Sequence, residues 1–263
     1  MEGINIENLS KTYRGDKGAS FRALDQVNFH WKPGEFISLV GESGCGKSTL
    51  ARILVGLEKP DKGNIELDGE NTCSWSYSKW REKRTRIQAV FQDTTGTLNP
   101  VRSVYYNLES AMVHLTRMTA SQRKERIQEL MELTRLEKHL MKTPVRQLSG
   151  GEQRRLSLVR AMSLRPDYFI LDEVTSGLDL ISSDAVLGVL EQYHREYGCA
   201  FLFITHDKNQ AYRLSDRILM MQNGHLVREG IKKQSREERI NYEEKSDFNH
   251  AQRFHGNGVA VRL

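Results

Sequence analysis

Residues 41–48 have types and spacing typical of a loop that holds phosphate groups, G-x-x-x-x-G-K-[ST]. Glycines in such a loop let backbone N–H groups turn toward an anion, and the N-terminus of a following helix adds partial positive charge. The lysine reaches the terminal phosphates, and the hydroxyl after it is a ligand for Mg²⁺. The residues expected to hold the phosphates are Gly41, Glu42, Ser43, Gly44, Cys45, Gly46, Lys47, Ser48 and Thr49, with Ser48 on the metal.

Phosphate binding by such a loop requires a strand before it and a helix after it, and the flanking segments fit both. Residues 36–40 form an apolar run that predicts a buried strand, and residues 49–57 predict a helix that ends in a turn. Strand, loop and helix in this order place a helix N-terminus against the bound anion. Cys45 lies beside Lys47 and this helix N-terminus, so we also expect a reactive thiolate there, with a side chain packed away from solvent as the alternative.

Two further apolar runs end in polar side chains. Residues 168–171 are followed by Asp172 and Glu173. In a protein with a phosphate loop, an aspartate at such a strand end binds Mg²⁺ directly or through water, and the adjacent glutamate can polarise an attacking water. Residues 201–204 lead to His206, which we expect to contact a γ-phosphate or to orient Glu173.

Ser149, Gly150 and Gly151 precede a long helical run and predict a second anion site at a helix N-terminus. An ordinary cap is the alternative, because serine is a favoured N-cap residue. Two observations favour the anion site. Polar residues follow it at Gln153, Arg154 and Arg155, and the carboxylates of Asp172 and Glu173 come 20 positions further along the chain.

Composition suits a soluble globular protein, with 38% hydrophobic and 28% charged residues and a net charge of +5. No apolar run approaches the roughly 20 residues that span a bilayer, and the N-terminus lacks the apolar core of a signal peptide. We therefore expect membrane association only through a partner. The charges are interspersed, so we expect no nucleic-acid partner. Three cysteines without metal-like spacing suit a reducing cytoplasm.

The order of the predicted elements indicates an α/β fold with a mainly parallel sheet. Strands are predicted at residues 4–9, 23–31, 65–67, 87–91 and 218–221, with a hairpin turn at Asp68-Gly69. Residues 94–164 read as an inserted helical subdomain, in which Thr119 begins a capping box. A helix over residues 182–197 should end at Gly198. Residues 231–263 are rich in mixed charge and form a C-terminal extension to a domain of residues 1–230.

Taken together, these motifs resemble the ATP-binding cassette (ABC) family over roughly residues 2–230. Residues 41–48 match its Walker A motif, residues 168–173 its Walker B motif and residues 148–152 its signature motif. The resemblance implies roles for further side chains. These are Tyr13 as the aromatic that stacks on adenine, Gln92 as the Q-loop residue that bridges nucleotide, Mg²⁺ and transporter, Asp179 in the D-loop, and His206 as the switch histidine.

For the fold, the resemblance implies a P-loop NTPase core with an N-terminal antiparallel β subdomain and the inserted helical subdomain. For function, it implies hydrolysis of ATP with Mg²⁺ at the cytoplasmic face of a membrane. The implied partners are a second ABC ATPase, two membrane permease subunits and an extracellular substrate-binding protein. ATP would close a head-to-tail dimer in which each nucleotide lies between Walker A of one subunit and the signature of the other.

The region after Gln92, including Leu98-Asn99-Pro100, is similar to the peptide/nickel importer subgroup, and within it to the second ATP-binding subunit. Nickel, a metal chelate or a peptide is the implied cargo, which the cassette itself does not touch. An exporter ATPase and a non-transport cassette remain alternatives, as does a homodimer in place of a heterodimer. A metal-sensing module built on His225, His250 and His255 is disfavoured by their spacing.

Overall fold

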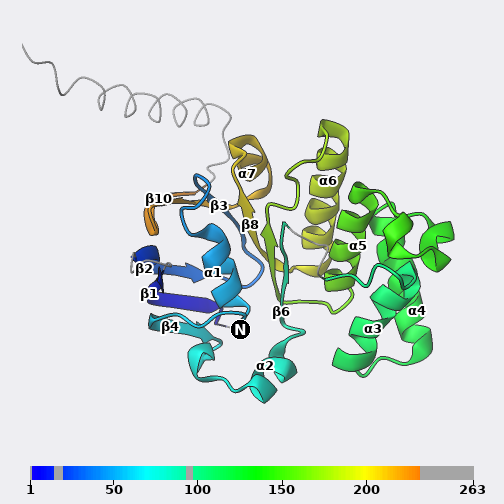
Figure 1. The fold of residues 1–263 in the computed structure, drawn as a ribbon, viewed down its shortest axis with the longest axis horizontal. Coiled ribbons are helices and arrows are strands. Elements are labelled where there is room, and N and C mark those ends of the chain that lie inside the picture. The colour runs from blue at the N-terminus through cyan, green and yellow to red at the C-terminus, as the bar shows by residue number, and fades with distance from the viewer. Residues whose placement is uncertain (1, 15–19, 93–96, 232–263) are drawn as a thin grey trace, which may run out of the picture. The chain divides into compact units, whose positions relative to one another are not determined.

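The computed structural model describes residues 2–14, 20–92 and 97–231 (Figure 1). The chain divides into two units, Met1–Gly230 and Ile231–Leu263, and the description below concerns the first. Its strands are β1 (Ile4–Arg14), β2 (Ser20–Trp31), β3 (Phe36–Val40), β4 (Lys62–Leu67), β5 (Glu70–Asn71), β6 (Ile87–Val90), β7 (Tyr168–Asp172), β8 (Ala200–Thr205), β9 (Arg217–Gln222) and β10 (His225–Ile231). Its α-helices are α1 (Lys47–Leu54), α2 (Tyr77–Lys83), α3 (Val104–Leu115), α4 (Ala120–Leu133), α5 (Gly150–Met162), α6 (Leu180–Tyr197) and α7 (Lys208–Leu214).

A six-stranded sheet runs in the order β10-β9-β3-β8-β7-β6. The pairs that β3 makes with β8 and β9, and that β7 makes with β6 and β8, are all parallel. Every residue of β3, β7 and β8 is buried, as expected for parallel strands that are covered on both faces. Because these strands run in one direction, the loops that follow them meet at one edge of the sheet.

The two faces of this sheet are packed by separate apolar clusters. Phe201 and Phe203 of β8 belong to a cluster with the helical segment, whereas Leu202 and Ile204 belong to a cluster with α1 and the N-terminal strands. Side chains of a strand point alternately to opposite faces, so one continuous apolar run supplies both cores. Trp31 and Tyr168, in edge-to-face contact with centroids 5.0 Å apart, lie fully buried in the second cluster.

The N-terminal strands form a second, antiparallel sheet in the order β2-β1-β4-β5. Ile4 lies opposite both Trp31 and Leu67, so β1 lies between β2 and β4. The hairpin predicted at Asp68-Gly69 is confirmed, with positive φ angles of 50° and 80° that match a two-residue turn.

The helical segment between β6 and β7 contains α3, α4 and α5, which contact one another (Figure 1). The capping box at Thr119 is confirmed, since its hydroxyl accepts from the Gln122 N–H and the Gln122 side chain accepts in return. Helix α6 ends at Gly198, which has a left-handed φ of 61°, as its sequence predicted. Short helices α2 and α7 and strand β10 were not anticipated. Within the described part of the chain, no helix is both long and apolar enough to cross a membrane.

A buried guanidinium joins the helices of this segment. Arg126 of α4 is almost fully buried and donates to the Met162 carbonyl at 3.0 Å, to the Tyr197 hydroxyl at 2.9 Å and to Glu129 at 2.9 Å. These contacts reach from α4 to the ends of α5 and α6. Removing the guanidinium would break all of these bonds at once, and hydrogen bonds that involve a charged group contribute more than neutral ones.

We therefore predict that Arg126→Met lowers the free energy of unfolding by about 2–3 kcal/mol, measured by urea denaturation. Lys124→Met, at an exposed position of the same helix, is the matched control and should change it by less than about 0.5 kcal/mol. If both variants had the same free energy of unfolding, the hydrogen bonds of Arg126 would not stabilise the helical segment as predicted.

Candidate nucleotide-binding site

The phosphate loop lies between β3 and α1, and its glycines are required for two different reasons. A Cβ at Gly41 would stand 2.3 Å from the Met221 carbonyl oxygen, and one at Gly46 would stand 2.2 Å from that of Ala23. These two glycines let the loop pack against neighbouring backbone. Gly44 has a φ of +79° and faces open space, so its requirement is conformational. The loop thus packs against neighbouring backbone at Gly41 and Gly46, whereas nothing covers it at Gly44.

Lys47 begins α1 and is buried, with its ammonium enclosed by the loop. Its Nζ donates to the carbonyl oxygens of Gly41 at 2.7 Å and Glu42 at 2.8 Å. Two backbone acceptors therefore hold the positive charge beneath the loop, where an anion cradled by the loop would meet it. The contact of Lys47 with the terminal phosphates stays a prediction.

The expectation of an accessible, reactive thiol at Cys45 is wrong for this conformation. Cys45 is only 7% exposed and packs with the apolar cluster that contains Leu50 and Ile204. Its Sγ lies 3.8 Å from the Lys47 Nζ but on the core side of the loop, close below Gly41. The loop backbone turns this side chain inward, so position 45 acts as a small apolar residue that supports the loop from beneath.

Asp172, the last residue of β7, is 4% exposed, and its Oδ1 has no hydrogen-bond partner among the described residues. Burial raises the pKa of this carboxyl and the charge of Glu173 adds to the effect, whereas the Ser48 hydroxyl and Lys47 oppose it. A buried carboxylate oxygen without a donor is costly unless a cation compensates it. Asp172 and the Ser48 hydroxyl are hard oxygen ligands of the kind that Mg²⁺ takes, so these residues fit the metal.

Glu173 directly follows β7 and has a left-handed backbone conformation with φ of 50°. Its N–H donates to the Ile204 carbonyl at 3.0 Å, which holds this unusual conformation beside the end of β8. The Glu173 Oε2 lies 3.6 Å from the Nδ1 of His206, and both side chains line a cavity of about 310 Å³. The structure thus brings together the acid and the histidine that the sequence placed 33 positions apart.

Ser149 is the N-cap of α5, so the ordinary capping role is present. Its hydroxyl accepts from the Glu152 N–H at 3.3 Å, and its own N–H donates to the Glu152 carboxylate at 2.7 Å. Ser149 and Gly150 are nevertheless exposed, and a Cβ at Gly150 would meet nothing within 4 Å. Among the described residues, no hydrogen bond or ion pair joins Ser149, Gly150 or Gly151 to the phosphate loop. These three residues form a separate surface in this chain.

The remaining predicted residues lie on strand β1, just beyond strand β6 and at the N-cap of α6. Tyr13 of β1 donates its hydroxyl to Glu58, which also accepts from the Arg52 Nε at 2.5 Å. No sequence signal pointed to Glu58 and Arg52 as supports of this aromatic ring. Gln92 is exposed just beyond β6, next to residues 93–96, which lie outside the described part. Asp179 caps α6 by accepting from the Ser182 N–H at 2.9 Å.

The histidines weighed as a metal sensor give that alternative no support. His225 lies 3.4 Å from the Asp25 carboxylate, and the ranges 2–14, 20–92 and 97–231 contain no group of three or more metal-ligating side chains. His250 and His255 lie outside the described residues.

Comparison with known proteins places this geometry in a family. The family model described as ABC transporter matches residues 24–176. The nickel import ATP-binding protein NikE of Escherichia coli (strain K12) is 38% identical over 231 residues, which is 86% of each chain. NikE of Shigella boydii serotype 4 is 37% identical over the same share.

Solved structures give the same answer for the fold. The dimeric, post-hydrolysis ATP-binding cassette MJ0796 bound to ADP and Pi superposes with a TM-score of 0.81 at 30% identity, covering 88% of this chain and all of that one. The cbiO1 subunit of the cbiONQ transporter complex of Clostridium perfringens superposes with a TM-score of 0.78 at 26% identity. The match covers 94% of this chain and 93% of cbiO1. With its family model, its relatives and its fold in agreement, the chain belongs to the ABC transporter family and contains that family's ATPase domain.

Proposed function

We propose that this chain is the ATP-hydrolysing subunit of an importer that takes up nickel, a metal chelate or peptides through partner membrane subunits. The observation that carries the proposal is the meeting of Lys47, Asp172, Glu173 and His206 beside the ends of three adjacent parallel strands. The similarity to NikE proteins supports nickel as cargo, and the resemblance of the segment after Gln92 to peptide/nickel importers agrees with it.

Hydrolysis follows from the positions of the side chains. The phosphate loop and Lys47 hold the terminal phosphates, while Tyr13 stacks on adenine. Water attacks the γ-phosphorus, the bond to the β–γ bridging oxygen breaks with its electron pair going to ADP, and Glu173 accepts the proton of the water. His206 positions Glu173 or the γ-phosphate. Mg²⁺, held by Ser48, Asp172 and Gln92, would neutralise charge on the phosphates.

The signature residues act in trans in this proposal. Ser149 and Gly150 are exposed, and no hydrogen bond or ion pair among the described residues joins them or Gly151 to the phosphate loop of their own chain, so a second cassette must bring its loop to them. Leu180 and Ile181, directly after Asp179, are 86% and 83% exposed. Two adjacent exposed aliphatic side chains fit a subunit interface at this point. We favour a different, homologous ATPase as the partner, with a second copy of this chain as the alternative.

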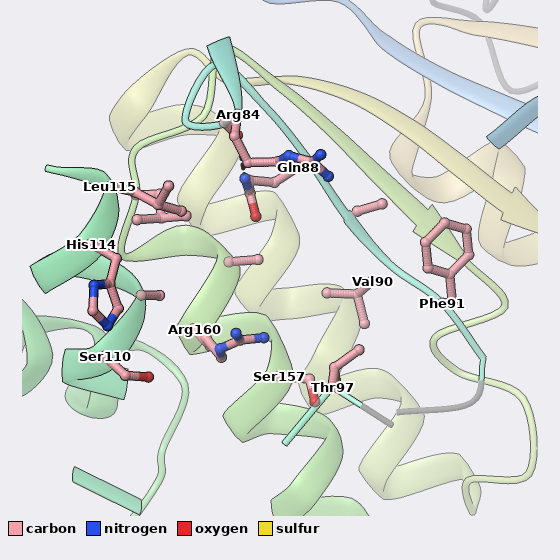
Figure 2. Close-up of a pocket in the computed structure, with 14 residues that line it drawn as sticks. Arg84, Gln88, Val90, Phe91, Thr97, Ser110, His114, Leu115, Ser157 and Arg160 are labelled. Atoms are coloured by element: carbon pink, nitrogen blue, oxygen red, sulfur yellow. Dashed lines mark hydrogen bonds between the residues drawn. The ribbon is translucent and has the colours of Figure 1, made fainter. Parts of the chain in front are cut away.

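The contact with the membrane subunits is proposed to use a groove beside Gln92. Residues of β6, α3 and α5 line this groove (Figure 2). It lies between the sheet and the helical segment, so a segment inserted there would contact both. In this way, movement of the helical segment on dimer closure would reach the membrane subunits at the cytoplasmic face.

The proposal is tested by affinity purification of the chain from detergent-solubilised native membranes, with mass spectrometry of its partners. Two membrane subunits, a second ATPase and an extracellular binding protein are expected. Binding of nickel and of peptides to that binding protein would then identify the cargo. Recovery with an exporter or with ribosomes would overturn the importer proposal, and recovery of two copies without a second ATPase would overturn the heterodimer.

Glu173→Gln should retain ATP binding and lower the hydrolysis rate about 10²–10⁴-fold, because the water loses its base while the phosphate loop is unchanged. Phosphate release by the purified complex measures the rate. Glu196→Gln, at an exposed position of α6, is the control and should hydrolyse normally. Turnover of Glu173→Gln within about twofold of wild type would remove Glu173 from this role.

Lys47→Ala should weaken ATP binding about tenfold or more and abolish turnover, since a charge-assisted contact to the terminal phosphates is lost. Titration with a fluorescent ATP analogue measures the affinity. Asp172→Asn should mainly reduce the dependence of ATP hydrolysis on Mg²⁺. Lys124→Ala, the control, should change neither the ATP affinity nor the turnover. Normal affinity together with normal turnover in Lys47→Ala would show that the loop does not hold phosphates.

Ser149→Arg should leave ATP binding to the isolated chain unchanged and block hydrolysis in the assembled complex, because the substitution fills a surface that only the other subunit's nucleotide reaches. Thr119→Arg, which removes the other capping box of the helical segment, is the matched control for helix stability. If both variants lost activity equally, capping alone would explain the result.

A further inference from the structure

Tyr13, the aromatic residue proposed to stack on adenine, is the last residue but one of β1. It pairs with Phe21 of β2 on one side, but the pairing of β1 with β4 on its other side ends at Ser10. Beyond that point, residues 58–61, which come between α1 and β4 in the chain, contact β1 instead. The position of the ring therefore depends on this segment as well as on the sheet.

Backbone and side-chain hydrogen bonds attach residues 58–61 to the end of β1. The Asp61 N–H donates to the Ser10 carbonyl at 2.9 Å, and the Asp61 carboxylate accepts from the Thr12 N–H at 2.7 Å. The Thr12 N–H holds the pKa of this carboxyl below its usual range, as expected for a hydrogen bond to the charged form. These contacts fix the segment beside the residue that precedes Tyr13.

The Tyr13 side chain is held at both its hydroxyl and its ring. The hydroxyl donates to the Glu58 carboxylate, which also accepts from the Arg52 Nε at 2.5 Å. The Lys11 Nζ lies 5.7 Å from the centre of the ring, within the range of a cation–π contact, and donates to the Lys59 carbonyl at 2.8 Å. The ring is therefore oriented by contacts within the chain itself.

The two residues that support the hydroxyl are tied to the helix that begins at the phosphate loop. Arg52 is in the last turn of α1, five residues after Lys47, which is about 7.5 Å along the helix axis. The Glu58 N–H donates to the Arg52 carbonyl at 3.4 Å, just beyond the helix end. Burial acts to lower the pKa of the Arg52 guanidinium, but its contacts with Tyr13 and Glu58 raise the pKa above its usual range. Helix α1 thus carries the phosphate loop at one end and the support of the ring at the other.

We propose that Glu58, held by Arg52, is a positioning residue that fixes the Tyr13 ring at the distance from the phosphate loop that the adenosine of ATP requires. This inference rests on the proposed function, in which Tyr13 stacks on adenine, and adds to it a residue that acts only through Tyr13. Such preorganisation favours binding because the aromatic side chain does not have to be ordered when the nucleotide arrives.

The test compares the binding of ATP with that of inorganic tripolyphosphate, which has no base, by calorimetric titration of the purified full chain. Glu58→Leu removes the acceptor and should weaken ATP binding about three- to tenfold, with tripolyphosphate binding unchanged. Glu58→Gln keeps an acceptor oxygen and should retain part of the lost affinity. Glu82→Leu, at an exposed position of α2, is the matched control and should bind both ligands like the wild type.

The tripolyphosphate measurement separates positioning of the ring from a general distortion of α1. A distorted helix would displace the phosphate loop and weaken the binding of both ligands. Equal losses of ATP and tripolyphosphate affinity in Glu58→Leu would therefore overturn the proposal, and so would an ATP affinity equal to that of the wild type.

A second variant leaves Glu58 and Arg52 in place. Tyr13→Phe keeps the ring and removes only the hydroxyl, so it should weaken ATP binding as much as Glu58→Leu does. The double variant should bind ATP no more weakly than either single variant, because both changes remove the same contact. Additive losses would show that Glu58 does not act through Tyr13. Wild-type ATP affinity in Tyr13→Phe would overturn the proposal even if Glu58→Leu failed to fold.

Tyr13→Leu separates this inference from the proposed function. Removal of the ring should weaken ATP binding about fivefold or more and leave tripolyphosphate binding unchanged, because only the stacking on the base is lost. If Tyr13→Leu bound ATP like the wild type, the stacking role in the proposed function would itself fail. If Tyr13→Leu lost affinity for ATP and Glu58→Leu did not, the positioning role of Glu58 alone would fail.

Discussion

Parallel pairing of β3, β8 and β7 is the constraint on which the rest of this structure depends. The register pairs Val40 with Thr205 and Asp172 with Ile204, so the three strands end at nearly the same level. The phosphate loop, the two carboxylates and His206 follow these ends. Parallel strands require crossover connections, and α1, α6 and the helical segment are those connections. The same topology that buries the strands on both faces therefore assembles the site at one edge.

The site contains features that folding alone would disfavour. Lys47 and Asp172 are both buried, and the backbone of Glu173 is left-handed. The loop carbonyls compensate Lys47 and the Ile204 carbonyl holds Glu173, but the Asp172 Oδ1 has no compensating donor in the described residues. A cation with the bound nucleotide would satisfy this oxygen, so the unsatisfied group lies at the proposed metal site.

Much of this arrangement was predictable from the sequence because the relevant signals are local. Continuous apolar runs predicted the buried strands, Gly198 predicted the end of α6 and Thr119 predicted a cap, since each depends on a few neighbouring residues. Helices α2 and α7 have seven residues each and few apolar side chains, so they gave no periodic pattern. The inward rotation of Cys45 and the support of Tyr13 by Glu58 depend on tertiary packing, which spacing in the sequence does not reveal.

Helix α5 and strand β6 link the candidate nucleotide site to the groove beside Gln92. Helix α5 is capped by the exposed Ser149, and about three turns later it places Arg160 in the groove beside β6. A helix is stiff over this length, so a displacement of its N-terminus in the proposed closed dimer would also move Arg160. Strand β6 is bonded to β7, which ends in Asp172, so the other wall of the groove is tied to the catalytic edge. A partner segment in this groove would thus contact both an element that leads to the Ser149 surface and one that leads to Asp172.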